Sequence, residues 1–389
     1  MAARSAPRSK RTPARPRPSA AAATRRRAQA PPRYVEALGA LESAGENVTL
    51  DIDGSLLKLT RLEKLLWPPD PASKAPGYTR RDYLDHLLRV GPYMLPHLRD
   101  RPLTLIRMPE GITGRRFVHF HYEQRLPAFV ETVNIFSEKS DRAEPFLLCN
   151  NMATALWLAH VGTLELHGWH SRVTPEPDAR EAGTDFASSL ESLRSSVLNY
   201  PDYIVFDIDP YIYSGAEAKG GQPEPNRPAF EKGKAVAFWL KALLDSMRIE
   251  TLVKTSGKTG VHVLVPIVRT VDYAAARAFA GAIARHLARE HPRDITVEWD
   301  VRQRTGKVFL DYQMNVRVKT LNVPYSVRGV PGAPVSMPLE WKTLETAQPE
   351  DFTLRNAAAI VEAKGDIWRD MLDRRQDLAK VLRAGAGLP

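Results

Sequence analysis

The sequence of 389 residues has one cysteine and no long apolar run. A single cysteine, Cys149, excludes an intramolecular disulfide and a cysteine-based zinc cluster, so we expect a buried core residue in a reducing cytoplasm. No apolar stretch approaches the roughly 18 residues that a membrane-spanning helix needs, which predicts no membrane partner. The basic N-terminus also lacks the apolar segment of a secretory signal.

Acidic residues are absent from residues 1–33, which hold ten Lys and Arg, whereas the charges of the remaining chain balance. The formal net charge of +10 therefore lies in this tail alone. A segment of Ala, Pro, Arg and Ser buries too little apolar surface to offset its ordering entropy, so we predict disorder. Its expected role is non-specific attraction to nucleic-acid phosphates, and an inert solubilising tail is the alternative.

Hydrophobic periodicity divides the rest of the chain into strands and helices. Val48–Leu59 alternates like a hairpin turned at Asp53-Gly54, Thr60–Trp67 is predicted to be a short helix, and Thr79–Leu98 an amphipathic helix capped by Thr79. Strands are also expected at 103–107, 163–166, 203–209, 251–254, 262–266 and 308–312, and helices at 151–159, 230–247, 272–290 and 352–384. Residues 173–199 and 213–229 are expected to be polar surface insertions.

Carboxylates stand on two of the expected apolar strands. Asp207 and Asp209 end the strand Tyr203–Asp209, and because residues two apart share a strand face, both should project side by side. Two such carboxylates repel unless a cation lies between them, and oxygen ligands favour Mg²⁺ or Mn²⁺. Asp311, on a later strand, would complete a two-ion centre for phosphoryl transfer if its strand were adjacent. Spacing alone leaves that adjacency open.

The segment Lys254–His262 has the residue types that bind phosphate. Its glycines let backbone N–H groups approach an anion, and its hydroxyls, lysine and histidine suit a triphosphate. The Gly-Lys-Thr tripeptide does not make a P-loop, because Leu252 stands where the first glycine is required. An ordinary hairpin turn is the alternative. The expected contacts are Ser256, Gly257, Lys258, Thr259 and His262.

Two similar patterns are interpreted as structural. Asp51 and Asp53 repeat the Asp-x-Asp spacing, but Gly54 follows at once and favours a turn. The histidine pairs His119/His121 and His167/His170 have no cysteines near them, so we expect no zinc there, and we interpret His119, His121 and His170 as polar core or surface residues.

In their order along the chain, the motifs resemble the polymerase domain of bacterial DNA ligase D, in the archaeo-eukaryotic primase superfamily. The resemblance covers about residues 56–345. It is carried by Leu59–Pro68, Tyr78–Asp82, Leu95–Thr104, Leu164–Trp169, Val205–Pro210, the Thr-Ser-Gly hairpin, Val308–Tyr312, Lys319-Thr320 and Pro324–Arg328. It implies an α/β (α+β) primase-polymerase core of mixed or antiparallel sheets flanked by helices, with the site in a cleft between sheets. We expect a basic tail at 1–33, a catalytic domain at 34–345 and a helical segment at 346–389 that packs on it.

The resemblance implies a template-dependent polymerase that extends a primer 3′-hydroxyl at gaps and broken DNA ends during non-homologous end joining. It implies NTP or dNTP substrates with a ribonucleotide preference, two Mn²⁺ or Mg²⁺ ions, Ku and a ligase as partners, and a nucleoid-associated place in a bacterial cytoplasm. The matching metal ligands are Asp207, Asp209 and Asp311. The positions at or near nucleotide contacts are His167, Ser256, Gly257, Lys258, Thr259, His262, Lys319 and Arg328.

Three further positions match DNA contacts of the family. Lys64 matches a lysine that holds the 5′-phosphate of the downstream strand, and Arg80 stands where a second lysine is usual. Phe117 is expected to stack on the template. The sequence departs from the family pattern at other contacts: Lys258 comes one place early and Thr259 follows it, Val118 and Phe120 stand where an aromatic residue and a lysine are usual, and Met314 replaces an amide.

Two alternatives stay open. One is a primase-polymerase for excision repair or primer synthesis that acts without Ku, although Lys64 and Arg80 favour a gap. The other is a non-catalytic module that bridges DNA ends, which the intact carboxylates disfavour. No ligase segment is visible in the sequence, so we expect a ligase on a separate chain or on a longer one.

Overall fold

The computed structural model describes residues 34–71, 74–122, 125–212, 214 and 227–383. These residues belong to one unit that extends over Pro32–Pro389. The basic tail and most of the 213–229 insertion lie outside the described residues, so the predictions for them stay open. Within the described ranges, no helix combines the length and the apolar character that crossing a bilayer demands.

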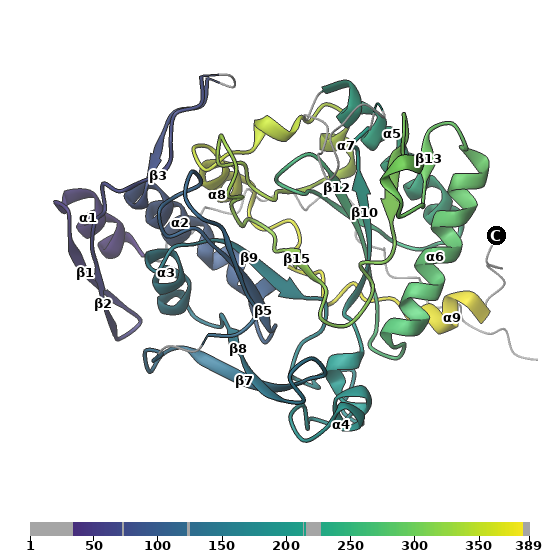
Figure 1. Cartoon of the computed structure of the whole chain (residues 1–389), viewed down its shortest axis with the longest axis horizontal. Coiled ribbons are helices and arrows are strands. Elements are labelled where there is room, and N and C mark those ends of the chain that lie inside the picture. The colour runs from purple at the N-terminus through teal and green to yellow at the C-terminus, as the bar shows by residue number, and fades with distance from the viewer. Residues whose placement is uncertain (1–33, 72–73, 123–124, 213, 215–226, 384–389) are drawn as a thin grey trace, which may run out of the picture. The chain divides into compact units, whose positions relative to one another are not determined.

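Two sheets form the centre of the fold (Figure 1). The larger has the strand order β13-β14-β10-β12-β11-β16, antiparallel except for β13 and β14. The smaller is antiparallel, with the order β15-β9-β5-β6. The strands of the larger sheet are β10 (Tyr203–Asp209), β11 (Leu252–Thr255), β12 (Val261–Pro266), β13 (Ile295–Thr296), β14 (Val308–Asp311) and β16 (Pro338–Leu339). Those of the smaller are β5 (Leu103–Arg107), β6 (Phe117–His119), β9 (Thr163–Trp169) and β15 (Thr320–Asn322).

Helices flank both sheets, which confirms the predicted fold class. The long helices α5 (Arg227–Ser246) and α6 (Tyr273–Glu290) pack against β10, and α3 (Met152–His160) packs against β9 and α2 (Arg80–Leu98). The remaining helices are α1 (Val35–Ser43), α4 (Leu190–Ser195), α7 (Trp341–Leu344), α8 (Ala357–Lys364) and α9 (Leu378–Arg383). Three hairpins complete the described elements: β1–β2 (Val48–Ile52, Ser55–Leu59), β3–β4 (Leu65–Trp67, Tyr78–Thr79) and β7–β8 (Glu131–Ser137, Arg142–Leu148).

Strand alternation decides which residues of β10 face the helices. Phe206 and Ile208 belong to the main core, together with residues of α5 and α6. Val205 belongs instead to a smaller apolar cluster that includes Leu321 of β15. Because residues two apart share a strand face, Asp207 lies on the Val205 side, which turns toward the smaller sheet. The apolar residues of β10 therefore orient the strand, and the carboxylates follow.

Local capping and turn chemistry agree with several predictions. Thr79 caps α2 through a capping box, in which its backbone N–H donates to the Asp82 carboxylate at 2.6 Å. Asp53 and Gly54 adopt positive φ values of 52° and 83° at the predicted hairpin turn, and Gly54 N–H donates to Asp51. Cys149 is fully buried and free, as expected.

The helix predicted over Thr60–Trp67 is wrong. Leu65–Trp67 forms β3 and pairs with β4. The backbone groups of this segment are engaged by the start of α2, because Arg80 N–H donates to the Lys64 carbonyl and Arg81 N–H to the Leu62 carbonyl. Tertiary hydrogen bonds thus replace the local ladder that a helix would need.

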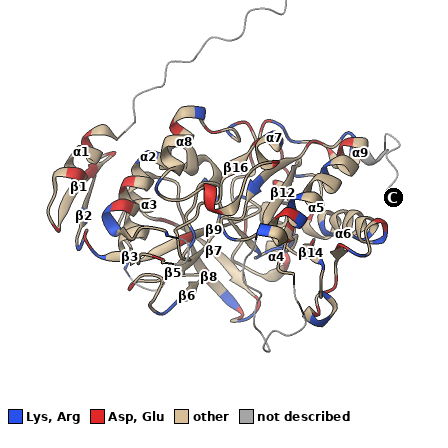
Figure 2. Ribbon diagram, turned by 90° about the horizontal axis from the view of Figure 1, so that it is seen from above, with Lys and Arg blue, Asp and Glu red and all other residues tan. Residues whose placement is uncertain are grey.

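The C-terminal segment contacts α2 and β15 through polar and apolar groups. Arg89 of α2 pairs with Glu362 of α8 at 2.6 Å. His97 pairs with Asp366 at 2.8 Å, and Asp366 also accepts the hydroxyl of Tyr325 at 2.6 Å. The domain boundary predicted at residue 345 stays a prediction. Basic and acidic residues are interspersed along the described ribbon (Figure 2), in keeping with the balanced charge count.

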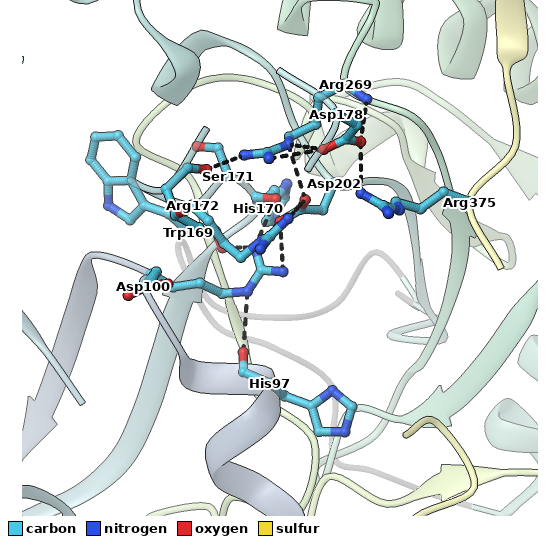
Figure 3. Close-up of polar contacts among 12 residues, drawn as sticks. His97, Asp100, Trp169, His170, Ser171, Arg172, Asp178, Asp202, Arg269 and Arg375 are labelled. Atoms are coloured by element: carbon cyan, nitrogen blue, oxygen red, sulfur yellow. Dashed lines mark hydrogen bonds and ion pairs between the residues drawn. The ribbon is translucent and has the colours of Figure 1, made fainter. Parts of the chain in front are cut away.

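A buried ion network precedes β10 (Figure 3). The carboxylate of Asp202, which is fully buried, lies 2.8 Å from Arg101, 2.9 Å from Arg172 and 3.5 Å from Arg269. Burial by itself would raise the pKa of Asp202, but the charges of these arginines outweigh burial and hold that pKa below its usual range. One carboxylate therefore keeps three guanidinium groups inside the fold.

The same arginines connect distant elements. Arg101, which follows α2, also donates to the carbonyl groups of Trp169 and His170 at the end of β9. Arg269, which follows β12, donates to the Thr174 carbonyl and pairs with Asp178 at 2.9 Å. The network thus joins the ends of β9, β10 and β12, and with them the two sheets.

Replacing Asp202 by alanine is expected to lower the free energy of unfolding by about 3–5 kcal/mol, because it leaves buried guanidinium groups without their carboxylate. Urea denaturation at neutral pH measures this loss. Asp245→Ala is the matched control, since Asp245 pairs with Lys241 at the exposed surface of α5 and such pairs contribute about 0.5 kcal/mol or less. Equal losses in the two variants would contradict a structural role for the network.

The loss of stability in Asp202→Ala is expected to be smaller at acid pH than at neutral pH. A carboxyl whose pKa is depressed in the folded state stabilises the fold above its unfolded pKa of about 4, and this contribution disappears as the pH falls through the folded value. The difference in stability between the wild type and Asp202→Ala is therefore expected to be constant above about pH 5 and to narrow in acid.

Candidate active site

The central strands of the larger sheet align four polar residues in one row. The register places Asp207 opposite Asp311 on one side and opposite His262 on the other, and places His262 opposite Lys254. The row therefore runs from Asp311 through Asp207 and His262 to Lys254, across four adjacent strands. Asp209 follows two residues after Asp207 and shares its face. The structure thus brings the three predicted carboxylates together, although Asp311 is distant in sequence.

Burial and mutual repulsion disfavour ionisation of these carboxyl groups. Burial raises the pKa of Asp207 to about 6. Burial, followed by the charge of Asp207, raises the pKa of Asp209 to about 7 and that of Asp311 to about 6. A divalent cation would relieve this repulsion, and an all-oxygen donor set suits Mg²⁺ or Mn²⁺. Within the described part of the chain, no three His, Cys, Asp or Glu side chains already lie in a metal-binding arrangement. The evidence for a metal site is therefore the strand register that brings the three carboxylates together.

A cleft of about 260 Å³ lies between the two sheets at this row. Asp207 and His262 line it from the larger sheet, and His167 and Asn322 line it from the smaller. A cleft thus lies between the two sheets, where the sequence analysis placed the site. Of the predicted nucleotide contacts, the lining includes His167, Ser256, Lys258, Thr259, His262 and Arg328, but neither Gly257 nor Lys319.

Ser256 closes the loop between β11 and β12 by accepting hydrogen bonds from the backbone of the same loop. The Ser256 hydroxyl oxygen accepts the N–H groups of Lys258 at 3.1 Å and of Gly260 at 2.9 Å. The Lys258 ammonium lies 5.9 Å from the centre of the Tyr211 ring, on the cleft side. Ser256 therefore stabilises the loop by accepting these two hydrogen bonds, and its own hydroxyl group can still donate one to a ligand.

Glu165, to which the sequence assigned no role, holds two of the predicted nucleotide contacts. Its carboxylate accepts a hydrogen bond from His167 at 2.8 Å and lies 3.3 Å from the Arg328 guanidinium. It also accepts the N–H of Gly329 at 2.9 Å. Burial opposes its ionisation, but His167 and Arg328 outweigh burial and lower its pKa to about 2. The available signal was its place two residues before His167, on the same strand face.

Two buried residues, Lys254 at the end of the row and Asn315 outside it, are held by hydrogen bonds to the surrounding chain. Lys254 is fully buried and donates to the Ser336 hydroxyl, and burial, followed by the charge of Arg328, lowers the pKa of Lys254. Asn315 pairs with both backbone groups of Val205, at 2.7 Å to the carbonyl and 2.8 Å to the N–H. Asn315 therefore continues the pairing of β10 beyond the end of β14 and fixes the strand that carries the carboxylates.

The two predicted 5′-phosphate contacts lie next to each other. The Arg80 N–H donates to the Lys64 carbonyl at 2.9 Å. The Lys64 ammonium pairs with Glu110 at 2.6 Å, while the buried Arg80 guanidinium donates to the Thr60 carbonyl at 2.6 Å. Burial, followed by the charge of Arg61, lowers the pKa of Arg80. The structure thus places both cations together, with one carboxylate already bound.

Phe117 lies on β6, the edge strand of the smaller sheet. The Arg115 guanidinium covers its ring at 4.9 Å from the centre. Phe120, at a position where the sequence departs from the family pattern, is 47% exposed. This edge therefore keeps a second accessible ring, three residues further along the chain.

Comparison with known proteins adds an independent observation. Residues 79–368, about three-quarters of the chain, match the family described as LigD, primase-polymerase domain. The chain belongs to this family. The resemblance inferred from the sequence motifs is therefore confirmed.

Several proteins of known name are similar to the chain. They include the multifunctional non-homologous end joining protein LigD of Pseudomonas aeruginosa, with 29% identity over 336 residues, and the bifunctional protein LigD of Bacillus subtilis, with 26% over 323 residues. These matches cover 85% and 82% of this chain but 34% and 45% of the relatives, so the chain spans less than half of their length. The solved polymerase domain of Mycobacterium tuberculosis ligase D, in complex with DNA, has a TM-score of 0.66 at 23% identity and covers 82% of this chain and 99% of its own. At that identity the likeness establishes the fold.

Gly257 is expected to be intolerant of a side chain. Its φ is +73°, and an added Cβ would lie 2.8 Å from Cγ of Arg328 and 2.8 Å from the Ser336 nitrogen. We expect Gly257→Ala to lower the free energy of unfolding by about 2–5 kcal/mol, the sum of left-handed strain and crowding. Gly306→Ala is the control, because Gly306 has a φ of +72° with nothing within 4 Å, so only the strain of about 1–2 kcal/mol applies. Denaturation curves that show equal losses would refute the crowding at Arg328.

Proposed function

We propose that this chain is a template-dependent nucleotidyltransferase that extends a primer 3′-hydroxyl at gaps and broken DNA ends. The observation that carries the proposal is the register that joins Asp207 and Asp311 on adjacent strands, with Asp209 beside them. His262 continues the same row into a cleft lined by basic and hydroxyl groups. Membership of the LigD primase-polymerase family supports the same reaction class.

The three carboxylates fit a pair of divalent ions. They share one sheet face and supply oxygen donors only. Their pKa values are raised, and a bound cation would stabilise the ionised carboxylates and so lower those values. Asp207, Asp209 and Asp311 would hold the ions, either Mn²⁺ or Mg²⁺. Bound there, such ions would supply activation of the attacking 3′-hydroxyl and neutralisation of charge on the triphosphate.

The neighbouring side chains provide a triphosphate site. His262 is buried, its Nε2 lies 3.4 Å from Asp207, and its Nδ1 has no partner among the described residues. Burial, followed by the charge of Lys254, lowers the pKa of His262, so the ring is neutral and offers a single N–H donor. Arg328, oriented by Glu165, adds positive charge to the same cleft. These groups would hold the nucleotide while the 3′-hydroxyl attacks the α-phosphate and displaces pyrophosphate.

Substrate preference and cellular role extend this proposal. Ser256 and His167 line the cleft and are our candidates to contact a ribose 2′-hydroxyl, which would favour ribonucleotides over deoxyribonucleotides. The names of the relatives, which are bacterial proteins, support a role in non-homologous end joining. Ku and a ligase as partners, and a bacterial cytoplasm as the location, are proposed from the family resemblance. Because the chain spans less than half of those relatives, their other functions are not transferred to it.

Asp207→Ala is expected to abolish primer extension while DNA binding persists. Loss of a direct ligand should exceed the roughly hundredfold cost that is typical of outer-shell partners. The measurement is extension of a gapped, 5′-phosphorylated duplex, with NTP compared with dNTP and Mn²⁺ with Mg²⁺. Fluorescence anisotropy of the labelled duplex measures binding separately.

Asp51→Ala is the matched control for this loss, since it alters the same Asp-x-Asp spacing at a hairpin turn. That variant should extend the primer at the wild-type rate. Undiminished synthesis by Asp207→Ala would refute the assignment of the carboxylates.

Lys64→Ala is expected to weaken binding of a 5′-phosphorylated gap by about tenfold, the cost of one charged hydrogen bond. The affinity of this variant for the same gap without the 5′-phosphate should differ little from that of the wild type, because that substrate lacks the group that Lys64 would contact. Lys58→Ala provides the control, as Lys58 is exposed on β2. An equal loss on both substrates would show that Lys64 does not recognise the phosphate.

A further inference from the structure

Trp299 is the one exposed tryptophan of the chain. All seven tryptophans lie in the described residues, and the other six are buried or half-buried. Trp299 is 61% exposed. So exposed a ring buries little of the large apolar surface that a tryptophan can contribute to a core, so its surroundings must show whether it has another role.

Side-chain contacts fix the position of this ring. Trp299 packs edge-on against Phe309, with ring centres 6.0 Å apart and planes at 73°. The Arg304 guanidinium lies 3.6 Å from the centre of the Phe309 ring and 5.5 Å from that of Trp299, and it donates to the Trp299 carbonyl at 2.7 Å. The indole is therefore held by its neighbours while most of its surface stays open.

The ring lies beside the proposed reaction centre. Phe309 is opposite Asp209 in the register of β10 and β14, and it precedes Asp311 by two residues. Residues two apart share a strand face, so Phe309 is on the face that carries the carboxylates. Trp299, which packs on Phe309, therefore borders that face on the β14 side.

One basic side chain near the ring is open to a ligand. Arg302 is paired with Asp300, and Arg304 is 7% exposed and donates to the Glu298 and Trp299 carbonyls. Lys307 is half-buried, and among the described residues it has no carboxylate at ion-pair distance. Burial raises the pKa values of Asp209 and Asp311, and the charge of Arg304 is among those that oppose this rise. An exposed aromatic ring with an unpaired lysine nearby matches the chemistry of a single nucleic-acid strand, whose bases stack and whose phosphates attract positive charge. An apolar protein surface would instead call for a wider apolar patch.

We propose that Trp299 stacks on an unpaired base of the DNA strand whose 3′ end lies at Asp209 and Asp311, with Lys307 facing its phosphates and Arg304 holding the ring in place. This segment, residues 299–307, would be a single-strand contact separate from the edge at Phe117. The inference rests on the proposed function, because that function places a 3′ end at the carboxylates. It adds a way to hold a protruding strand that has no complementary partner.

Intrinsic fluorescence tests the proposal directly, because Trp299 is the one indole open to a ligand. A single-stranded oligothymidylate is expected to quench the emission of the wild type. An abasic phosphodiester chain of the same length should quench far less, since it supplies phosphates without bases. Equal quenching by both chains, or none by either, would overturn the proposal.

Variants measure the energy of the contact. With a labelled oligothymidylate, Trp299→Ala is expected to bind about fivefold to a hundredfold more weakly by anisotropy, the range for loss of one base-aromatic stack. Trp299→Phe should retain most of the affinity, whereas Trp299→Leu should not, because leucine fills space without a ring. Val301→Ala is the matched control, since Val301 is an exposed apolar residue of the same loop at 43% exposure.

The outcomes separate this inference from the proposed function. Asp207→Ala should keep the fluorescence quenching and lose extension. Wild-type affinity in Trp299→Ala or in Trp299→Leu overturns the stacking contact and leaves the polymerase proposal intact. A wild type that quenches with DNA but extends no primer refutes the polymerase proposal, while the stacking contact stands. Thermal unfolding of each variant confirms that the fold is retained, and the comparison of phenylalanine with leucine remains decisive if the alanine variant unfolds.

Discussion

The geometry of the candidate site depends on a single buried carboxylate. Asp202 stands immediately before β10 and neutralises charge from three arginines that reach it from α2, the end of β9 and the end of β12. A buried guanidinium is tolerated only when it is paired and its remaining donors are satisfied, and here backbone carbonyl groups take up those donors. The two sheets that line the cleft are therefore connected at the strand that carries Asp207 and Asp209. The placement of the cleft follows from that connection.

The spacing of strands in the larger sheet then determines how far apart the acidic and basic residues of the candidate site lie. Neighbouring strands lie about 4.8 Å apart, so a row of four residues on adjacent strands spans a distance comparable to a metal pair with a triphosphate beside it. In this row, Asp311 and Asp207 form the acidic end, and His262 and Lys254 form the end that lies toward the β11–β12 loop. On the proposed function, the groups that would hold ions and those that would hold phosphate are separated by strand order. The strand order, rather than any single residue, therefore sets which end of the row is acidic and which end lies toward the β11–β12 loop.

The sequence predicted those parts whose signals are local. The strand Tyr203–Asp209 was recognisable because apolar alternation and carboxylate spacing lie within seven residues, and α2 because its capping box is complete. Asp311 required the family resemblance, since pairing of strands about a hundred residues apart leaves no local trace. Glu165 was not identified because its partner Arg328 is distant in sequence. The β3 segment was assigned to a helix for the same reason, as its hydrogen bonds come from the start of α2.

Charge placement explains how a body with balanced charge is able to hold DNA. Acidic and basic groups are interspersed over the described residues (Figure 2), so affinity must come from particular cations. Two of these cations already have carboxylate partners: Lys64 contacts Glu110, and Arg328 contacts Glu165. A phosphate that binds at such a cation exchanges with a carboxylate as well as with counterions, so the salt dependence should be weaker than a count of basic contacts would give. Lys307, near Trp299, has no such carboxylate partner among the described residues, and a single strand that stacks on Trp299 would therefore meet a less hindered phosphate contact there.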